Sequence, residues 1–217
     1  MKTRELWKGI LAGVCIGLGG TIYLKTGGVA GACLFAFGLI AVVSLGLNLF
    51  TGKAQFVWRR PGDYAWLAGI LGCNIIGCLA LALAVSSPAI HEAAVKVIDM
   101  RLALNPLRAG VLAIGCGFIM TLAVQNAAKG RWLPLLFGIP AFILCGLPHC
   151  VADAFYICAL PYDYFISHIG GIIPFYLAIV AGNFLGCNAY RLVAPGVSRP
   201  VASPTQNVEV IAEKDIN

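Results

Sequence analysis

His149 lies inside an otherwise apolar stretch of the chain, where few side chains can do acid–base chemistry. Cys150 follows it directly, and Asp153 comes four residues later. A histidine of ordinary pKa, about 6.5, exchanges a proton near neutral pH, and an ionisable residue among apolar ones is a candidate for function. Asp153 has three interpretations: it pairs with a basic group, it is protonated, or it lies beyond the apolar region.

A catalytic use of this segment is not favoured. Adjacent residues on a helix point about 100° apart, so His149 and Cys150 do not converge on one substrate. The nine cysteines all fall in apolar segments, and none forms a close Cys-x-x-Cys pair, so we interpret them as packing residues. We therefore expect no enzyme, no metal and no cofactor, with a membrane-embedded enzyme as the lesser alternative.

A repeated pattern indicates that the chain has two related halves. Asn-x-x-Gly-Cys occurs at 74–78 and again at 183–187, each time in the middle of an apolar run. The element before each copy is irregular, at Thr51-Gly52-Lys53 and at Gly146-Leu147-Pro148. We expect two halves of three helices, at about 6–90 and 107–195. Because three is odd, the second half would be inverted, with a substrate site near the membrane midplane where the interrupted helices meet.

The composition places these elements in a membrane. Of 217 residues, 60% are hydrophobic and 11% charged, with a mean hydropathy of +0.89, whereas a soluble domain is about a quarter charged. This excludes a secreted or cytosolic enzyme, a disordered chain and a nucleic-acid-binding protein. A spanning helix needs about 20 apolar residues. The apolar runs lie at about 6–25, 26–52, 65–90, 109–128, 132–160 and 164–190.

These runs predict an all-α polytopic membrane protein with six transmembrane helices, the second and fifth broken, in one channel domain over residues 1–195. With the N-terminus inside, eleven Lys and Arg residues fall on the cytoplasmic side and four outside. Cytoplasmic loops carry such an excess, so both termini are predicted in the cytoplasm and the protein in the cell (inner) membrane. Residues 196–217, rich in Pro, Ser and charge, are expected to form a disordered cytoplasmic tail.

Several motifs, in order along nearly the whole chain, resemble the formate/nitrite transporter family of anion channels. Leu49-Phe50-Thr51-Gly52 resembles the family's Leu-Phe-Thr-Gly at the break of its second helix. His149-Cys150-Val151-Ala152-Asp153-Ala154-Phe155 resembles its His-x-x-Ala-Asn-x-Phe after the break of the fifth. The two Asn-x-x-Gly elements, at Asn74 and Asn183, are similar to those of its third and sixth helices.

The resemblance implies an aquaporin-like fold, one pore in each protomer, and a homopentamer surrounded by lipid. It implies that His149 is a central pore residue facing Thr51, and that Lys96, in the connection before the fourth helix, is the cation of an outer vestibule. Two apolar constrictions would flank His149. They are Phe35, Leu39 and Phe142 on the outer side and Leu49 and Phe50 on the inner side.

The chain departs from the family pattern near these residues. Asp153 stands where the family usually has Asn, Pro148 replaces a usual Glu, and Lys53 follows Thr-Gly where Asn is common. The Arg-Gly-Ile-Leu-Cys-Asn of the fourth helix is matched only loosely by residues 108–113, without its Asn. These departures bear on the substrate and on the partner of the histidine, not on the fold.

The expected substrate is a small monovalent weak-acid anion. An anion cannot cross an apolar constriction in its charged form, because the desolvation cost is many kcal/mol. Two proton sources are open: His149 protonates the anion, or water does and His149 only hydrogen-bonds the passing species. Formate, nitrite and hydrosulfide fit, and Lys53 suggests a divergent branch favouring hydrosulfide. A channel for water or small neutral solutes is the alternative, but the Asn-Pro-Ala signature of aquaporins is absent.

Overall fold

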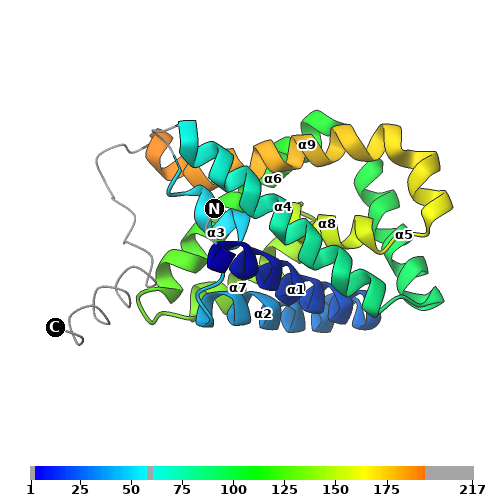
Figure 1. Ribbon diagram of the computed structural model, residues 1–217, viewed down its shortest axis with the longest axis horizontal. Helices are drawn as coiled ribbons and strands as arrows, with labels where there is room; N and C mark the ends of the chain where they lie inside the picture. The colour runs from blue at the N-terminus through cyan, green and yellow to red at the C-terminus, as the bar shows by residue number, and fades with distance from the viewer. Residues whose placement is uncertain (1–2, 58–60, 194–217) are drawn as a thin grey trace.

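The computed structural model of the chain describes residues 3–57 and 61–193, and within those ranges it contains helices and no strand (Figure 1). The predicted tail, residues 196–217, lies outside the described residues. In chain order the helices are α1 (Thr3–Thr26), α2 (Gly28–Ser44), α3 (Phe50–Ala54), α4 (Pro61–Ala84), α5 (Pro88–Leu102), α6 (Pro106–Ala127), α7 (Leu133–Leu144), α8 (Cys150–Cys158) and α9 (Tyr162–Val193).

Four described helices, α1, α4, α6 and α9, are long and apolar enough to cross a membrane, and α2 and α7 are apolar but shorter. The chain is therefore built as a multi-pass membrane protein. The expected second run, 26–52, is divided between α2 and α3, and the expected fifth run, 132–160, between α7 and α8.

The two interruptions have the same backbone geometry. Gly46 and Gly146 adopt positive φ angles of 58° and 68°, a region that only glycine enters at little cost. The following amides close the helix ends: Leu47 N–H donates to Val42 O and Leu147 N–H to Phe142 O, both at 2.9 Å. This is the Schellman arrangement, which stops a helix sharply.

Glycines allow two helix pairs to cross at very short distance. A Cβ added to Gly77 of α4 would lie 2.0 Å from Ile10 O of α1, and one added to Gly186 of α9 would lie 2.0 Å from Ile114 O of α6. Helices in membranes approach this closely only through small residues. The Gly of each Asn-x-x-Gly-Cys copy is therefore the contact point of its helix pair, and α1–α4 and α6–α9 are equivalent units.

The short helices α3 and α8 lie between these pairs, at the centre of the molecule (Figure 1). α3 packs against α4, α6 and α9, whereas α8 packs against α1, α4, α5 and α9. Each short helix thus contacts both halves of the chain, and α2 packs against α7 below them. This arrangement brings residues near 50 and near 150 together.

The connection between α4 and α6 differs from the sequence expectation. Lys96 was expected in a connecting loop, but residues 88–102 form α5. Ser87 caps this helix by accepting a hydrogen bond from Ile90 N–H, and Pro88 occupies its first turn. A Ser followed by Pro is a recognisable helix start, so this helix could have been predicted.

Candidate functional site

Asn74 anchors the first interrupted helix. Its Oδ1 accepts a hydrogen bond from Phe50 N–H, 2.9 Å away, at the start of α3. Its Nδ2 donates to Gly9 O of α1 at 2.8 Å and to Asn48 O of the break at 2.9 Å. The side chain is fully buried, and it supplies the broken backbone with partners that water cannot supply inside a membrane.

Asn183 does the same for the second interrupted helix. Its Oδ1 accepts from Cys150 N–H at 2.8 Å, and its Nδ2 donates to Ala113 O at 2.8 Å and to Pro148 O at 3.0 Å. It too is fully buried. Asn74 and Asn183 therefore position the half-helices, and neither side chain is exposed for contact with a substrate.

The cysteine of each repeated motif contacts the half-helix of the other half. Cys187 Sγ donates to Thr51 O at 3.2 Å, and Cys78 Sγ donates to Val151 O at 3.5 Å. Both thiols are buried. They agree with the interpretation of the cysteines as packing residues, and they couple α9 to α3 and α4 to α8.

Thr51 and His149 meet at the junction of the two interrupted helices. Thr51 Oγ1 and His149 Nε2 lie 2.9 Å apart, and both side chains are buried. His149 Nδ1 accepts a hydrogen bond from Ala152 N–H at 3.1 Å, so His149 is also the N-cap of α8. Because Nδ1 is an acceptor, the ring proton of the neutral form sits on Nε2 and is donated to Thr51. The Thr51 hydroxyl hydrogen is left to serve another acceptor.

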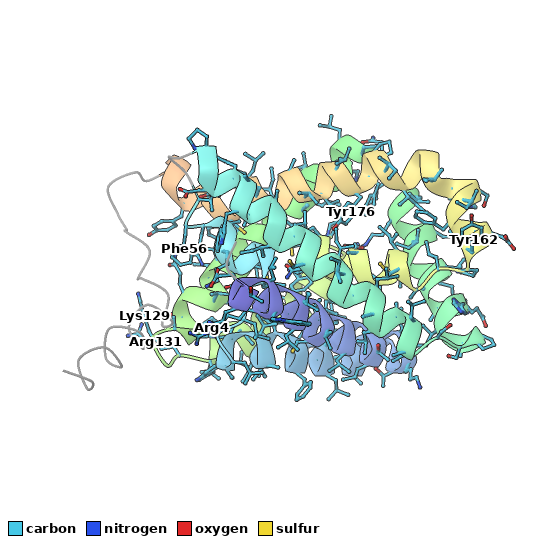
Figure 2. The ribbon with its side chains drawn as sticks, viewed as in Figure 1. Arg4, Phe56, Lys129, Arg131, Tyr162 and Tyr176 are labelled. Atoms are coloured by element: carbon cyan, nitrogen blue, oxygen red, sulfur yellow. The ribbon has the colours of Figure 1, made fainter. Side chains whose placement is uncertain are left out.

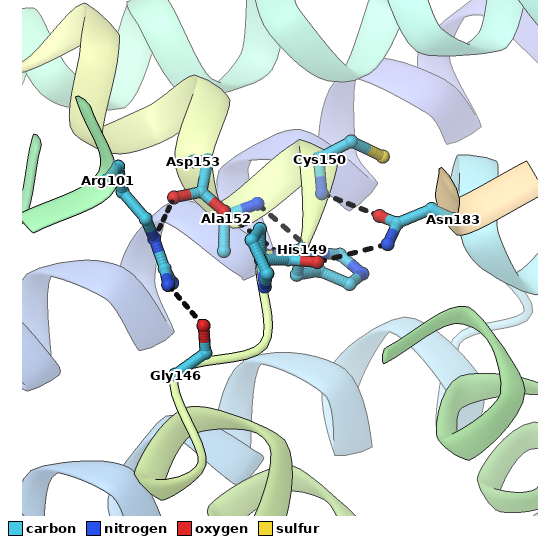
Figure 3. A network of polar contacts seen from close by, with 8 residues as sticks. Arg101, Gly146, His149, Cys150, Ala152, Asp153 and Asn183 are labelled. Atoms are coloured by element: carbon cyan, nitrogen blue, oxygen red, sulfur yellow. Dashed lines mark hydrogen bonds and ion pairs between the residues drawn. The ribbon is translucent and has the colours of Figure 1, made fainter. Parts of the chain in front are cut away.

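Asp153 pairs with a basic group, one of the three interpretations left open above. Its Oδ1 accepts from Arg101 Nε of α5 at 2.9 Å, and its Oδ2 accepts from His149 N–H at 2.9 Å (Figure 3). Arg101 Nη1 also donates to Gly146 O, 2.6 Å away, in the break (Figure 3). The carboxylate is fully buried, whereas the Arg101 side chain is 15% exposed. A buried carboxylate needs such a partner, so this network fixes the backbone that carries His149.

Arg101 is one of the four Lys and Arg residues that the charge count puts outside the membrane, and no sequence motif gives it a role. The available signal was Asp153 itself, because a carboxylate in an apolar run calls for a basic partner. Because 52 residues separate Arg101 from Asp153, the sequence does not indicate which basic residue is the partner of Asp153.

A cavity lies on each side of the Thr51–His149 contact. The larger, which we call the Arg101 cavity, has a volume of about 430 Å³ and is lined by Arg101 and His149 with aromatic and aliphatic side chains. The smaller, the Lys53 cavity, has a volume of about 70 Å³ and includes Lys53 and Leu49 in its lining. The two cavities share no lining residue.

The residues expected to form the outer and inner constrictions do not line the two cavities as two separate sets. Phe142 lines the Arg101 cavity and stacks on His149, with ring centroids 5.7 Å apart, and Phe35 meets Phe142 edge-on at 6.4 Å. Leu39, expected on the same side as Phe142, instead lines the Lys53 cavity together with Leu49. Phe50 is buried at the start of α3 and lines neither cavity.

Lys96 lies on the exposed side of α5. It forms an i,i+4 ion pair with Glu92, 2.8 Å away, and their side chains are 71% and 70% exposed. The hydrogen bond from Lys96 lowers the pKa of Glu92. Lys96 is not among the residues that line the Arg101 cavity.

The fold and this site are those of a helical membrane channel or transporter. The model of the formate/nitrite transporter family matches residues 2–194, and the chain belongs to that family. It is similar to a pentameric formate channel solved with formate bound (TM-score 0.75, 18% identity, 88% of this chain and 94% of that one). It is likewise similar to an FNT family ion channel (TM-score 0.73, 18% identity, 91% and 90%).

The chain is also similar to a curated protein described as a transporter. The chain is 33% identical over 178 residues to the uncharacterized transporter YrhG of Bacillus subtilis, a match that covers 70% of this chain. The match spans 66% of the length of YrhG.

Asn183→Leu tests the anchoring function. Leucine has a similar size but leaves Cys150 N–H and two carbonyls without partners, each at a cost of about 1–3 kcal/mol. We expect a loss of at least about 3 kcal/mol of stability, seen as a large drop in the melting temperature of the detergent-solubilised protein. Asn126→Leu, which removes one hydrogen bond within α6, should change it little. Equal effects of the two substitutions would contradict the anchoring function.

Proposed function

We propose that this protein is a membrane channel for small monovalent weak-acid anions of the formate, nitrite or hydrosulfide class. The observation that carries the proposal is the Thr51–His149 contact at 2.9 Å, buried between two cavities at the junction of two interrupted helices. The path runs from the Arg101 cavity past Phe142 and His149 to Thr51, and then past Leu49 into the Lys53 cavity.

The anion crosses as its neutral acid. Apolar side chains dominate the step between the two cavities, and a bare anion would lose its hydration there with little compensation. The Thr51 hydroxyl offers one hydrogen bond to the passing species while its oxygen accepts from His149 Nε2. His149 thus orients Thr51 and keeps one polar group available in an apolar passage.

Water in the Arg101 cavity supplies the proton. Protonating His149 requires a proton on Nδ1, which already accepts the N–H of Ala152 at 3.1 Å. The protonated ring would therefore lose the cap of α8. This geometry favours the second of the two proton sources above, in which His149 hydrogen-bonds and water protonates the anion.

The remaining architecture follows the family. Six crossings, with α2–α3 and α7–α8 each counted as one, would form an inverted repeat over residues 1–195 and assemble as a homopentamer in the inner membrane. Exposed apolar side chains such as Phe37, Leu83 and Phe137 provide surface for lipid and partner protomers. Arg4, Lys129 and Arg131 lie at one end of the molecule and Tyr162 at the other (Figure 2), which supports both termini in the cytoplasm.

Thr51→Val tests the pathway. The position equivalent to Thr51 in the second half is Val151, so valine fits this backbone, and only the hydroxyl is lost. We expect formate, nitrite or hydrosulfide uptake into proteoliposomes to fall about tenfold, as expected for the loss of one buried hydrogen bond of about 1.4 kcal/mol. Thr21→Val, which removes a hydroxyl bonded to Gly17 O within α1, should leave uptake unchanged. Equal uptake by both variants, or no anion uptake by the wild type, would refute the proposal.

His149→Asn separates the two proton sources. Asparagine is a good N-cap and can cap α8 in place of His149, but its side chain is too short to reach Thr51. We expect reduced uptake that still rises as the external pH is lowered, because water then provides more of the neutral acid. The check is the uptake rate against external pH for the wild type and the variant. Uptake that loses its pH dependence in the variant would identify His149 as the proton donor.

A further inference from the structure

Arg101 is the charged side chain among the described residues that line the Arg101 cavity. The other walls are mainly aromatic and aliphatic, including Tyr23, Met100, Leu112 and Phe142. An anion that enters this cavity therefore meets one cation among mainly apolar walls, where an electrostatic contact is stronger than in bulk water.

The guanidinium has unused donors. Nε donates to Asp153 Oδ1 and Nη1 donates to Gly146 O, which accounts for two of the five N–H bonds of an arginine. Nη2 has no acceptor among the described residues. The two existing contacts hold the guanidinium plane in place, so the free donors are already oriented before a ligand arrives.

We infer that Arg101 forms an oxyanion-binding site in the Arg101 cavity, which selects planar two-oxygen anions such as formate and nitrite over hydrosulfide. This inference rests on the proposed function and names the substrate class that the same pathway prefers. A guanidinium pairs two N–H donors with two oxygens of a planar anion, whereas a spherical or single-atom anion gains only the charge.

Asp153 keeps this site from holding its anion too tightly. Its buried carboxylate lies 2.9 Å from Arg101 Nε and compensates much of the positive charge. Conduction needs a site that is favourable enough to enter and weak enough to leave. The Arg101 guanidinium, with two N–H donors for the anion and a partly neutralised charge, meets both needs. Asp153 is the residue that positions this guanidinium.

Lys96 does not provide such a site. Its ammonium is largely exposed and already paired with Glu92 on the same helix. The vestibule role that the family resemblance implies for Lys96 therefore falls to Arg101, one and a half turns further along α5.

Arg101→Lys tests the inference because it keeps the charge and removes the fork. We expect the half-saturating concentrations of formate and nitrite for uptake into proteoliposomes to rise about tenfold. Hydrosulfide uptake should change less than twofold, so the formate-to-hydrosulfide ratio falls. Lys96→Gln, on the same helix, should leave all three anions unchanged. An equal change for every anion, or no change for any, would overturn the inference.

A binding measurement separates this inference from the proposed function. Sodium formate, added at constant ionic strength with sodium chloride as the comparison, should raise the melting temperature of the detergent-solubilised wild type and not that of Arg101→Lys. Arg101-dependent stabilisation without anion flux would refute the channel proposal and support the site. Anion flux without Arg101-dependent stabilisation would support the channel proposal and refute the Arg101 binding site. Melting temperatures without formate show whether the variant is folded.

Discussion

The structure depends on one constraint: a helix that breaks inside a membrane must find partners for the backbone groups it frees. Two buried asparagines meet this constraint. Asn74 and Asn183 each bind the first N–H of a half-helix, a carbonyl of the break and a carbonyl of a neighbouring long helix. Without these contacts the ends at Leu49 and His149 would have no fixed position, and the Thr51–His149 contact would not form.

The repeat supplies the scaffold, and the differences between its copies supply the chemistry. Equivalent contacts are made at the breaks, at the asparagines and at the glycine crossings. The residues at the site differ between the two copies of the repeat. The positions equivalent to Leu49, Thr51 and Lys53 of the first copy are occupied in the second by His149, Val151 and Asp153. One half therefore contributes a hydroxyl and the other an imidazole, which together make one polar contact in an apolar passage.

How much could be predicted from the sequence depended on how local the signal was. The apolar runs, the doubled Asn-x-x-Gly-Cys motif and the positions of the irregular segments are visible along the chain, and the family was confirmed. Long-range pairing was not visible: nothing near Arg101 in sequence reveals Asp153, and nothing near Leu39 reveals which cavity it lines. The vestibule role of Lys96 stays a prediction, and the charged side chain that lines the cavity, Arg101, lies further along α5.

A native cysteine allows a direct test of whether anions pass through the Arg101 cavity. Cys145 is exposed and lines that cavity. The measurement is anion uptake into proteoliposomes of the Cys33→Ser variant, before and after complete modification by a membrane-impermeant thiol reagent, with Cys33→Ser/Cys145→Ser as the control. We expect modification of Cys145 to block uptake and the control to be unaffected. Undiminished uptake after complete modification of Cys145 would contradict it.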